Sequence, residues 1–221
     1  MISITKSERD NIELLTRGQA NNPEWKAQRQ LRITSSMFGP ICKRTERRDI
    51  DKLIGSIING KPVLSKAIRH GIMYEAVARE KYVAMMATEV ESCGLFISEE
   101  TPFLAASPDG LVSDDICIEI KCPYAAKDRP ISSTNIPFLC QTGLKINHDF
   151  YYQIQGQLYC TGRQSCHFCV YTHSDFKVFE IKKDEAFISQ MVEALTLFYE
   201  NHFKKALIDK HVYASYAQYY L

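Results

Sequence analysis

The sequence predicts an α/β fold in which a central mixed sheet is flanked by helices. Two observations predict it: apolar residues recur at helical spacing in some segments, and short apolar runs bounded by turn-forming or polar residues lie between them. The resulting order is helix, three strands, helix, two strands, helix. No linker divides the 221 residues, so we expect a single domain over residues 1–221.

The first two predicted helices precede the strands. Residues 7–16 form a short, polar-rich helical segment. About residues 64–88 follow, and their helical spacing gives one apolar stripe made of Ile72, Met73, Ala76, Val77, Val83 and Ala84. We therefore expect this second helix to pack on the core through that stripe.

The other two predicted helices lie in the second half of the chain. Residues 149–161 place one set of apolar side chains on the same side: Tyr151, Ile154, Leu158 and Tyr159. Asp184 is a suitable N-cap for a last helix, along which four apolar residues recur: Phe187, Met191, Leu195 and Phe198. This C-terminal part, residues 184–221, ends in a tyrosine-rich tail without a readable period.

Five segments predict strands, namely residues 94–97, 103–106, 116–122, 167–172 and 176–181. Between the third and the fourth lies a segment with two prolines, one glycine and several Ser, Thr and Asn residues, residues 129–147. Its composition predicts a loop, and we expect that loop to be mobile.

Charge and composition exclude several classes of protein. The 27 Lys and Arg residues nearly balance the 26 Asp and Glu residues, which argues against a polybasic binder. A basic surface must then be concentrated, and we assign it to Lys43, Arg44, Arg47 and Arg48. No apolar run reaches about 18 residues, so we expect no membrane partner.

The N-terminal residues and the eight cysteines predict an intracellular protein that is not secreted. The first residues, MISITKSERDNIELL, lack the basic and apolar regions of a secretory signal. Several cysteines lie in apolar, strand-like runs, which is typical of buried thiols in a reducing compartment such as cytoplasm or nucleus. Cys166 and Cys169 form a C-x-x-C pair, but residues three apart on a strand point to opposite faces, so we expect core cysteines rather than a metal site.

The chemistry is concentrated in the stretch ASPDGLVSDDICIEIKCPY, residues 106–124. Alternation along the third strand puts Glu119 and Lys121 on the face opposite its isoleucines. A hairpin would bring Asp109, ten residues before Glu119, beside them. Converging carboxylates favour Mg²⁺ or Mn²⁺, and a neighbouring ammonium orients water or binds a phosphate oxygen. The alternative is a surface ion pair on a solvated strand face, which leaves the turn aspartate unexplained.

Asp109 followed by Glu119-Ile120-Lys121 resembles the signature of the PD-(D/E)xK nuclease superfamily, whose core is restriction-endonuclease-like. The longer match, SPDG…IEIKCPY, resembles the phage lambda-type exonuclease family, also called YqaJ-like viral recombinases. Three further elements resemble that family in its own order over about residues 25–171: WKAQR with ITSS, GIMYE, and YYQIQ.

The resemblance implies roles for individual residues. Asp109 and Glu119 would bind metal together with the backbone carbonyl of Ile120, and Glu75 would reach a second metal or its water. Lys121 would activate the attacking water, and Gln153 would hold that water or the phosphate. The implied cofactors are two Mg²⁺ or Mn²⁺ ions in each active site.

The resemblance also implies a site for a terminal 5′-phosphate, made of Arg29, Ser36, Ser107 and Lys127. A guanidinium with hydroxyl groups suits a phosphate dianion. Lys127 stands where better-known members have arginine, which predicts weaker dependence on the phosphate. Ser35 stands where alanine is more common, so which of the two hydroxyls at positions 35 and 36 faces the site stays open.

The function implied is a Mg²⁺-dependent exodeoxyribonuclease that degrades double-stranded DNA ends from 5′ to 3′ and leaves 3′ overhangs for recombination by strand annealing. Similar proteins form homotrimers and act with a single-strand annealing protein. The alternatives are a structure-specific or nicking endonuclease on the same fold, and a catalytically silent DNA-binding module. A Cas4-like nuclease with an iron–sulfur cluster is a third, but the cysteine spacing does not fit it.

Overall fold

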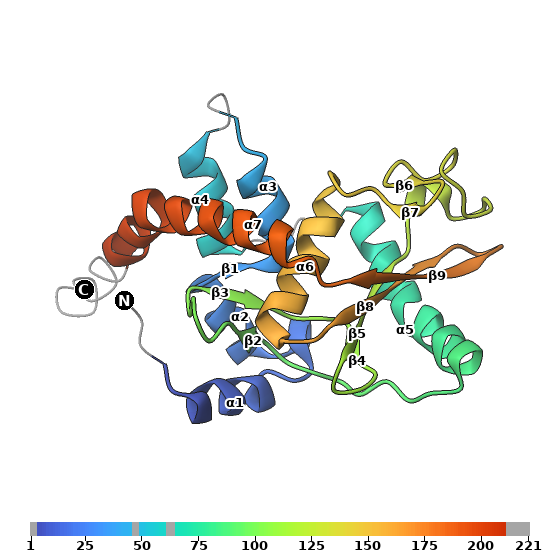
Figure 1. The fold of residues 1–221 in the computed structure, drawn as a ribbon, viewed down its shortest axis with the longest axis horizontal. Coiled ribbons are helices and arrows are strands. Elements are labelled where there is room, and N and C mark those ends of the chain that lie inside the picture. The colour runs from blue at the N-terminus through green and yellow to red at the C-terminus, as the bar shows by residue number, and fades with distance from the viewer. Residues whose placement is uncertain (1–3, 46–48, 61–64, 211–221) are drawn as a thin grey trace.

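The computed structural model describes residues 4–45, 49–60 and 65–210 (Figure 1). Arg47 and Arg48 of the predicted basic surface, and the tyrosine-rich tail beyond residue 210, lie outside the described residues. The element order is that of a mixed α/β protein, as the sequence predicts.

The strands form two main sheets and one small hairpin. The first sheet has the order β1-β3-β2, with β1 parallel and β2 antiparallel to β3: β1 Ile33–Thr34, β2 Phe96–Ile97, β3 Leu104–Ala106. The second has the order β4-β5-β8-β9: β4 Gly110–Leu111, β5 Ile116–Lys121, β8 Ser165–Tyr171, β9 Phe176–Lys182. Its central pair, β5 and β8, is parallel and the outer pairs are antiparallel, so this sheet is mixed.

The helices surround these sheets (Figure 1). Their bounds are α1 Lys6–Leu15, α2 Pro23–Gln30, α3 Phe38–Cys42, α4 Ile50–Asn59, α5 Lys66–Met86, α6 Asp149–Thr161 and α7 Glu185–Phe198. Short turns add η1 Gln19–Asn21, η2 Ser35–Met37, η3 Tyr124–Ala126 and the π-helical η4 Tyr199–Phe203. Within the described ranges, no helix is both long enough and apolar enough to cross a membrane.

The four predicted helices are confirmed, and their N-termini are capped by side chains. Asp184 accepts a hydrogen bond from Phe187 N at 3.0 Å, as expected for the cap of α7. Ser65 caps α5, and Thr5 forms a capping box with Glu8 at the start of α1. The sequence did not predict α2, α3 and α4, which are short and lie between residues 23 and 59.

Strand β5 lies between two helices, and its alternation decides which residues meet each of them. Ile118 and Ile120 pack with Ala78 and Tyr82 of α5. Cys117 belongs to the core on the other side, with Ile154 and Leu158 of α6. The predicted alternation is therefore confirmed. The face of β5 that carries Glu119 is covered by α6 and is not exposed to solvent.

The predicted apolar stripe of α5 is wrong. Ile72 is 64% exposed and Met73 is 67% exposed, while Ala78 and Tyr82 are fully buried. Tyr82 also pairs its hydroxyl with His167 Nδ1 of β8 at 2.5 Å. Aromatic and small residues of α5, such as Tyr82 and Ala78, face the sheet. A prediction based on the spacing of aliphatic side chains does not detect such a face.

The segment 129–147 was expected to be a mobile loop, but it packs on the core. It contains the hairpin of β6 (Leu139–Cys140) and β7 (Gly143–Leu144). Ile131 and Ile136 are buried in the same core as α6, and Ile131 N donates to Asp175 Oδ2 at 2.9 Å. The buried apolar side chains therefore hold this segment on the core although it is rich in turn-forming residues.

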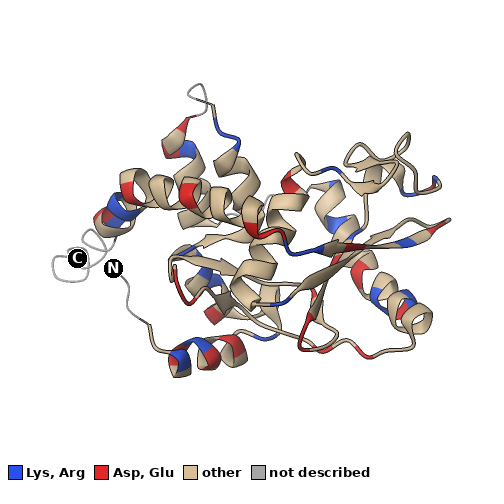
Figure 2. Ribbon diagram, in the orientation of Figure 1, with Lys and Arg blue, Asp and Glu red and all other residues tan. Residues whose placement is uncertain are grey.

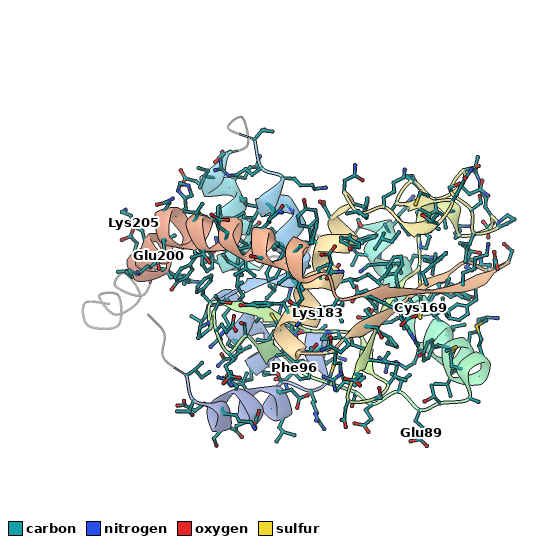
Figure 3. All side chains as sticks on the ribbon, in the orientation of Figure 1. Glu89, Phe96, Cys169, Lys183, Glu200 and Lys205 are labelled. Carbon is teal, nitrogen blue, oxygen red and sulfur yellow. The ribbon has the colours of Figure 1, made fainter. Side chains whose placement is uncertain are left out.

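The prediction that Cys166 and Cys169 are core cysteines is confirmed. All eight cysteines lie within the described residues, and each is a free thiol. Cys166 belongs to the core on the α6 side and Cys169 to the core on the α5 side, so the C-x-x-C pair does not converge (Figure 3 labels Cys169). Burial raises the pKa of Cys42 to about 12, which makes a thiolate ligand unfavourable there.

Close approach of α6 to the N-terminal helices requires glycine at position 156. A Cβ atom there would lie 2.5 Å from two ring carbons of Phe38 and 3.0 Å from Ser35 Cβ. We expect Gly156→Ala to lower the free energy of unfolding by about 1–3 kcal/mol through overpacking. Chemical denaturation measures it.

Gly71→Ala is the matched control for this prediction. Gly71 is also in a helix, but a Cβ there would meet no atom within 4 Å. The control should be neutral or should stabilise by up to about 1 kcal/mol through helix propensity. Equal effects of the two substitutions would contradict the close-packing explanation.

Candidate active site

The site begins at the turn that connects β3 to β4. Asp109 N donates to Ile118 O at 3.0 Å, and Ile120 N donates to Asp109 Oδ2 at 2.6 Å. The backbone of β5 therefore holds the carboxylate of Asp109 beside the strand that carries Glu119 and Lys121. This is the hairpin arrangement that the sequence predicts.

Glu119 is the central group of the site, and it is only 2% exposed. Its Oε1 accepts hydrogen bonds from the ammonium of Lys121 and from Gln153 Nε2, the latter at 2.6 Å. Its Oε2 accepts from Gln157 Nε2 at 2.6 Å. A surface ion pair, the alternative considered from the sequence, is excluded by this burial.

Lys121 remains an ammonium in this environment. Burial would lower its pKa, but the charges of Glu119 and Asp109 outweigh burial and raise the pKa above the ordinary lysine value. Nζ also lies 4.6 Å from the ring centroid of Phe150, which adds a cation–π contact. The side chain therefore supplies positive charge and protons to donate.

Helix α5 contributes a third carboxylate. Burial raises the pKa of Glu75, the charge of Arg79 opposes this, and the charge of Glu119 adds to it. Burial also raises the pKa of Asp109 well above its ordinary value, and Glu119 raises it further while Lys121 opposes the shift. These mutual effects place Glu75, Asp109 and Glu119 in one electrostatic cluster.

Two side chains that the sequence did not single out fix the turn around Asp109. Arg79 Nη2, from α5, donates to Asp109 O. Gln19 Nε2, from the N-terminal segment, donates to Pro108 O at 2.7 Å and to Cys93 O at 3.1 Å. No local motif marks either residue, because both act on a turn that is distant in sequence.

A cleft of about 710 Å³ opens over this cluster. Glu75, Asp109 and Lys121 lie in it, and its walls are apolar: Ile68 and Ile72 from α5, Tyr124 from η3, and Pro137, Phe138 and Phe150. Its volume is in the range of small-molecule sites in proteins. The exposed Ile72, which is unfavourable for a core helix, is explained as a wall of the cleft.

A second, smaller pocket of about 250 Å³ lies beside α2. Arg29 and Ser36 line it together with Trp25, and the Arg29 guanidinium lies 4.2 Å from the Trp25 ring centroid. Trp25 Nε1 donates to Ser107 Oγ at 2.8 Å. Burial lowers the pKa of Arg29 to about 10, so it stays charged at neutral pH.

The comparison with known proteins agrees with this geometry. The chain matches the YqaJ-like viral recombinase domain over residues 24–164, which is more than half of its length and includes Arg29, Asp109, Glu119 and Lys121. The chain belongs to this family. The resemblance inferred from the sequence is confirmed.

Relatives of the YqaJ-like chain include nucleases. The alkaline exonuclease LHK-Exo from Laribacter hongkongensis has a solved structure with a TM-score of 0.70 and 27% identity, covering 87% of this chain and 98% of that one. A structure of LHK-Exo in complex with dAMP gives a TM-score of 0.71. The predicted restriction-endonuclease-like fold of the PD-(D/E)xK type is thereby confirmed.

Two viral proteins are also similar. An alkaline nuclease of Orgyia pseudotsugata multicapsid polyhedrosis virus is 27% identical over 184 residues, and an uncharacterized protein of Acanthamoeba polyphaga mimivirus is 27% identical over 172 residues. These alignments cover 71% and 72% of the YqaJ-like chain but only 41% and 30% of the viral proteins. The chain therefore spans less than half the length of these relatives.

The predicted 5′-phosphate residues are partly brought together. Arg29, Ser36 and Ser107 gather around Trp25, whereas Lys127 does not line that pocket. The Lys127 ammonium instead contacts Asp128. The question of the two serines is answered, because Ser36 is exposed and lines the pocket, while Ser35 is buried.

Acidic and basic residues are interspersed over the helices of the YqaJ-like chain (Figure 2). Of the predicted basic surface, Lys43 pairs with Asp149 at the start of α6 and donates to Asn147 O at 3.0 Å. Arg44 follows it and is half-buried. Lys43 lies near the wall of the cleft, because its partner Asp149 adjoins Phe150.

The carboxylates are a suitable but incomplete set of metal ligands. Within the described ranges, no three His, Cys, Asp or Glu side chains are gathered into a ready-made cluster. Asp109 and Glu119 supply hard oxygen atoms, and added positive charge would offset the burial and the charge of Glu119 that together raise the pKa of Asp109. This donor chemistry fits a divalent cation between the two, with the Ile120 carbonyl as a backbone oxygen.

Gln157 is a buried polar residue that the sequence did not predict for the site. It is 0% exposed, and its Oε1 has no hydrogen-bond partner among the described residues. Such an unpaired acceptor costs about 1–3 kcal/mol. The signal that could have found it is its spacing, since Gln153 and Gln157 are four residues apart and share one helix face.

The charge of Asp109 should destabilise the folded protein in the absence of metal. Its pKa is raised on folding, so its contribution to stability falls as the pH rises above the unfolded value of about 3.9. Asn keeps an oxygen to accept from Ile120 N and carries no charge. We expect Asp109→Asn to raise Tm in chelator at about pH 8, by about 2–4 °C for each kcal/mol gained.

Calorimetry with chelator at about pH 4 and pH 8 measures this effect, and the gain should be larger at pH 8. Asp114→Asn, an exposed substitution in the same β4–β5 hairpin, is the control and should leave Tm unchanged. A lower Tm for Asp109→Asn at pH 8 would show that the carboxylate stabilises the folded state, against the direction inferred.

Proposed function

We propose that this chain is a metal-dependent deoxyribonuclease that degrades linear double-stranded DNA from its 5′ ends. One observation carries the proposal: the buried Glu119 is paired with Lys121, and Lys121 and Asp109 line an open cleft. A buried carboxylate cluster destabilises a fold, so a catalytic role is the reason that best accounts for it. The LHK-Exo likeness supports the same class of enzyme.

The metal would be Mg²⁺ or Mn²⁺, held by Asp109, Glu119 and the Ile120 carbonyl, with Glu75 serving a second ion or its water. A bound divalent cation supplies water activation and charge neutralisation at the scissile phosphate. Glu75 lies in the cleft with Asp109, which supports this assignment.

The remaining catalytic residues act through charge and hydrogen bonding. Lys121, as an ammonium, donates to the attacking water or to a phosphate oxygen and stabilises the charge that develops there. Gln153 donates to Glu119 Oε1, so it orients the carboxylate as well as any water beside it.

Direction and end-specificity come from the Arg29 pocket. Its guanidinium and the Ser36 hydroxyl suit a terminal 5′-phosphate, and the Trp25–Ser107 hydrogen bond ties this pocket to the segment that carries Asp109. Lys127 is proposed as an accessory contact that engages DNA outside the pocket. The products would be 3′ overhangs, suited to recombination through a single-strand annealing protein, and a homotrimer would enclose the duplex.

A second candidate function is a structure-specific or nicking endonuclease on the same fold. The cleft is open rather than enclosed by the described residues, and a continuous strand could therefore enter it. A catalytically silent DNA-binding module is the third candidate, but it gives no reason for burying Glu119 with Asp109 and Lys121.

The test uses three substrates with and without Mg²⁺: linear duplex with 5′-phosphate ends, the same duplex with 5′-hydroxyl ends, and a covalently closed circle. We expect Mg²⁺-dependent release of nucleotides from linear DNA only. Lys121→Met, which keeps the stem but removes the charge, should reduce the rate on the order of 10²–10⁴-fold.

Lys205→Met is the control, because Lys205 lies beyond α7 (labelled in Figure 3) and forms an ion pair with Asp209 rather than with a residue of the cleft. It should behave as wild type. Cleavage of the closed circle would favour the endonuclease, and no cleavage of any substrate would favour the silent module.

Arg29→Met should affect the two kinds of DNA end differently. The substitution removes the guanidinium from the Trp25 pocket, so cleavage of 5′-phosphorylated ends should fall by about tenfold or more, corresponding to about 1.4 kcal/mol. Cleavage of 5′-hydroxyl ends should change less. Initial rates on the two duplexes measure the ratio, and equal losses would remove Arg29 from end recognition.

A further inference from the structure

Helix α6 carries three glutamines with different surroundings. Gln155 is fully buried, and both ends of its amide are satisfied: Nε2 donates to Lys182 O and Oε1 accepts from Asp184 N, each at 2.9 Å. This amide joins α6 to the segment between β9 and α7. Gln153 and Gln157 lie on a different face, because residues four apart on a helix align and residues two apart do not.

The side chain of Gln157 makes one hydrogen bond among the described residues, and it is to Glu119. Its Nε2 donates to Glu119 Oε2 at 2.6 Å, while Gln153 Nε2 donates to Glu119 Oε1 at the same distance. The two amides thus hold both oxygen atoms of one carboxylate from one helix face. This fixes the plane of the carboxylate, which one hydrogen bond with Lys121 would not do.

The environment of Gln157 gives the fold no reason to prefer an amide there. The side chain is fully buried, and its Oε1 is unpaired among the described residues. Leucine or methionine of similar volume would fill the space without burying an unpaired acceptor. The hydrogen bond to Glu119 is therefore the interaction that distinguishes glutamine from an apolar residue at this position.

We propose that Gln157 is a positioning residue, which holds the carboxylate of Glu119 in the orientation needed to bind a divalent cation. The inference rests on the proposed function, since it takes Glu119 as a metal ligand. Residues that orient metal ligands in this way affect metal affinity by about 10–100-fold when they are replaced. Gln157 acts through Glu119 and does not contact DNA or the reacting atoms.

The test compares Gln157→Leu with wild type by calorimetric titration of Mn²⁺ in the absence of DNA. We expect the Mn²⁺ dissociation constant to rise by about 10–100-fold. Tm in chelator should fall only modestly, because the lost hydrogen bond to Glu119 Oε2 is partly offset by removal of the unpaired Oε1. On linear duplex DNA the KM should stay near wild type, and the lost rate should partly return at high Mn²⁺ concentration.

Gln155→Leu is the matched control, since it removes the other fully buried amide of the same helix. We expect it to lower Tm, because it breaks the hydrogen bonds to Lys182 and Asp184, and to leave Mn²⁺ affinity near wild type. Gln157→Met is a second variant with a more flexible side chain. If both Gln157 variants fail to fold, the amide serves the fold and the proposal is overturned.

The outcomes separate this inference from the function on which it rests. Wild type that binds Mn²⁺ and cleaves DNA, with Gln157→Leu equal to it in Mn²⁺ affinity, would overturn the role of Gln157 alone. Wild type that neither binds Mn²⁺ nor cleaves DNA would overturn the proposed nuclease and this role together.

Discussion

The burial of one carboxylate, that of Glu119, is the constraint on which the site depends. An ionised carboxylate cannot be removed from water without compensation, and here three donors from two elements provide it: Lys121 on β5 itself, and Gln153 and Gln157 on α6. The hydrogen bonds require α6 to cross directly over β5. Packing of that helix, including its contact with Phe38 at Gly156, is therefore part of the geometry of the site.

The same cluster works against the stability of the fold. Asp109 and Glu119 repel each other, and burial raises the pKa of Asp109 and of Glu75. The charges of Lys121 and Arg79 offset part of this repulsion. Their charges leave the cluster in need of further positive charge, which is the physical reason that a divalent cation suits it.

The segment Ser107-Pro108-Asp109 joins the two pockets. Ser107 accepts from Trp25 in the pocket of Arg29, the Pro108 carbonyl accepts from Gln19, and Asp109 faces the catalytic cleft. Three consecutive residues therefore set the distance between the Arg29 pocket, which suits a terminal phosphate, and the cleft that contains Asp109, which suits hydrolysis. Such a fixed separation is what an enzyme that measures from a strand end requires, because positioning errors of about 1 Å reduce the rate strongly.

The sequence by itself determined the features that depend on neighbouring residues. Because side chains alternate along a strand, the sequence of β5 predicted that Lys121 shares a face with Glu119. Because a short turn returns the chain beside itself, the spacing between Asp109 and Glu119 predicted the hairpin. The cap at Asp184 and the bounds of α6 follow from equally local rules. Hence the fold class and the grouping of Asp109, Glu119 and Lys121 could be predicted from the sequence.

Only the tertiary structure decided which residues pack on each face of a helix or strand. The apolar residues of α5 at positions 72 and 73 turned out to be exposed, because aromatic and small residues form its contact with the sheet. Gln19, Arg79 and Gln157 entered the site through partners between 30 and 89 residues away. Hydrogen bonds over such separations leave no periodic trace in a sequence, since their geometry exists only once helices and strands have packed.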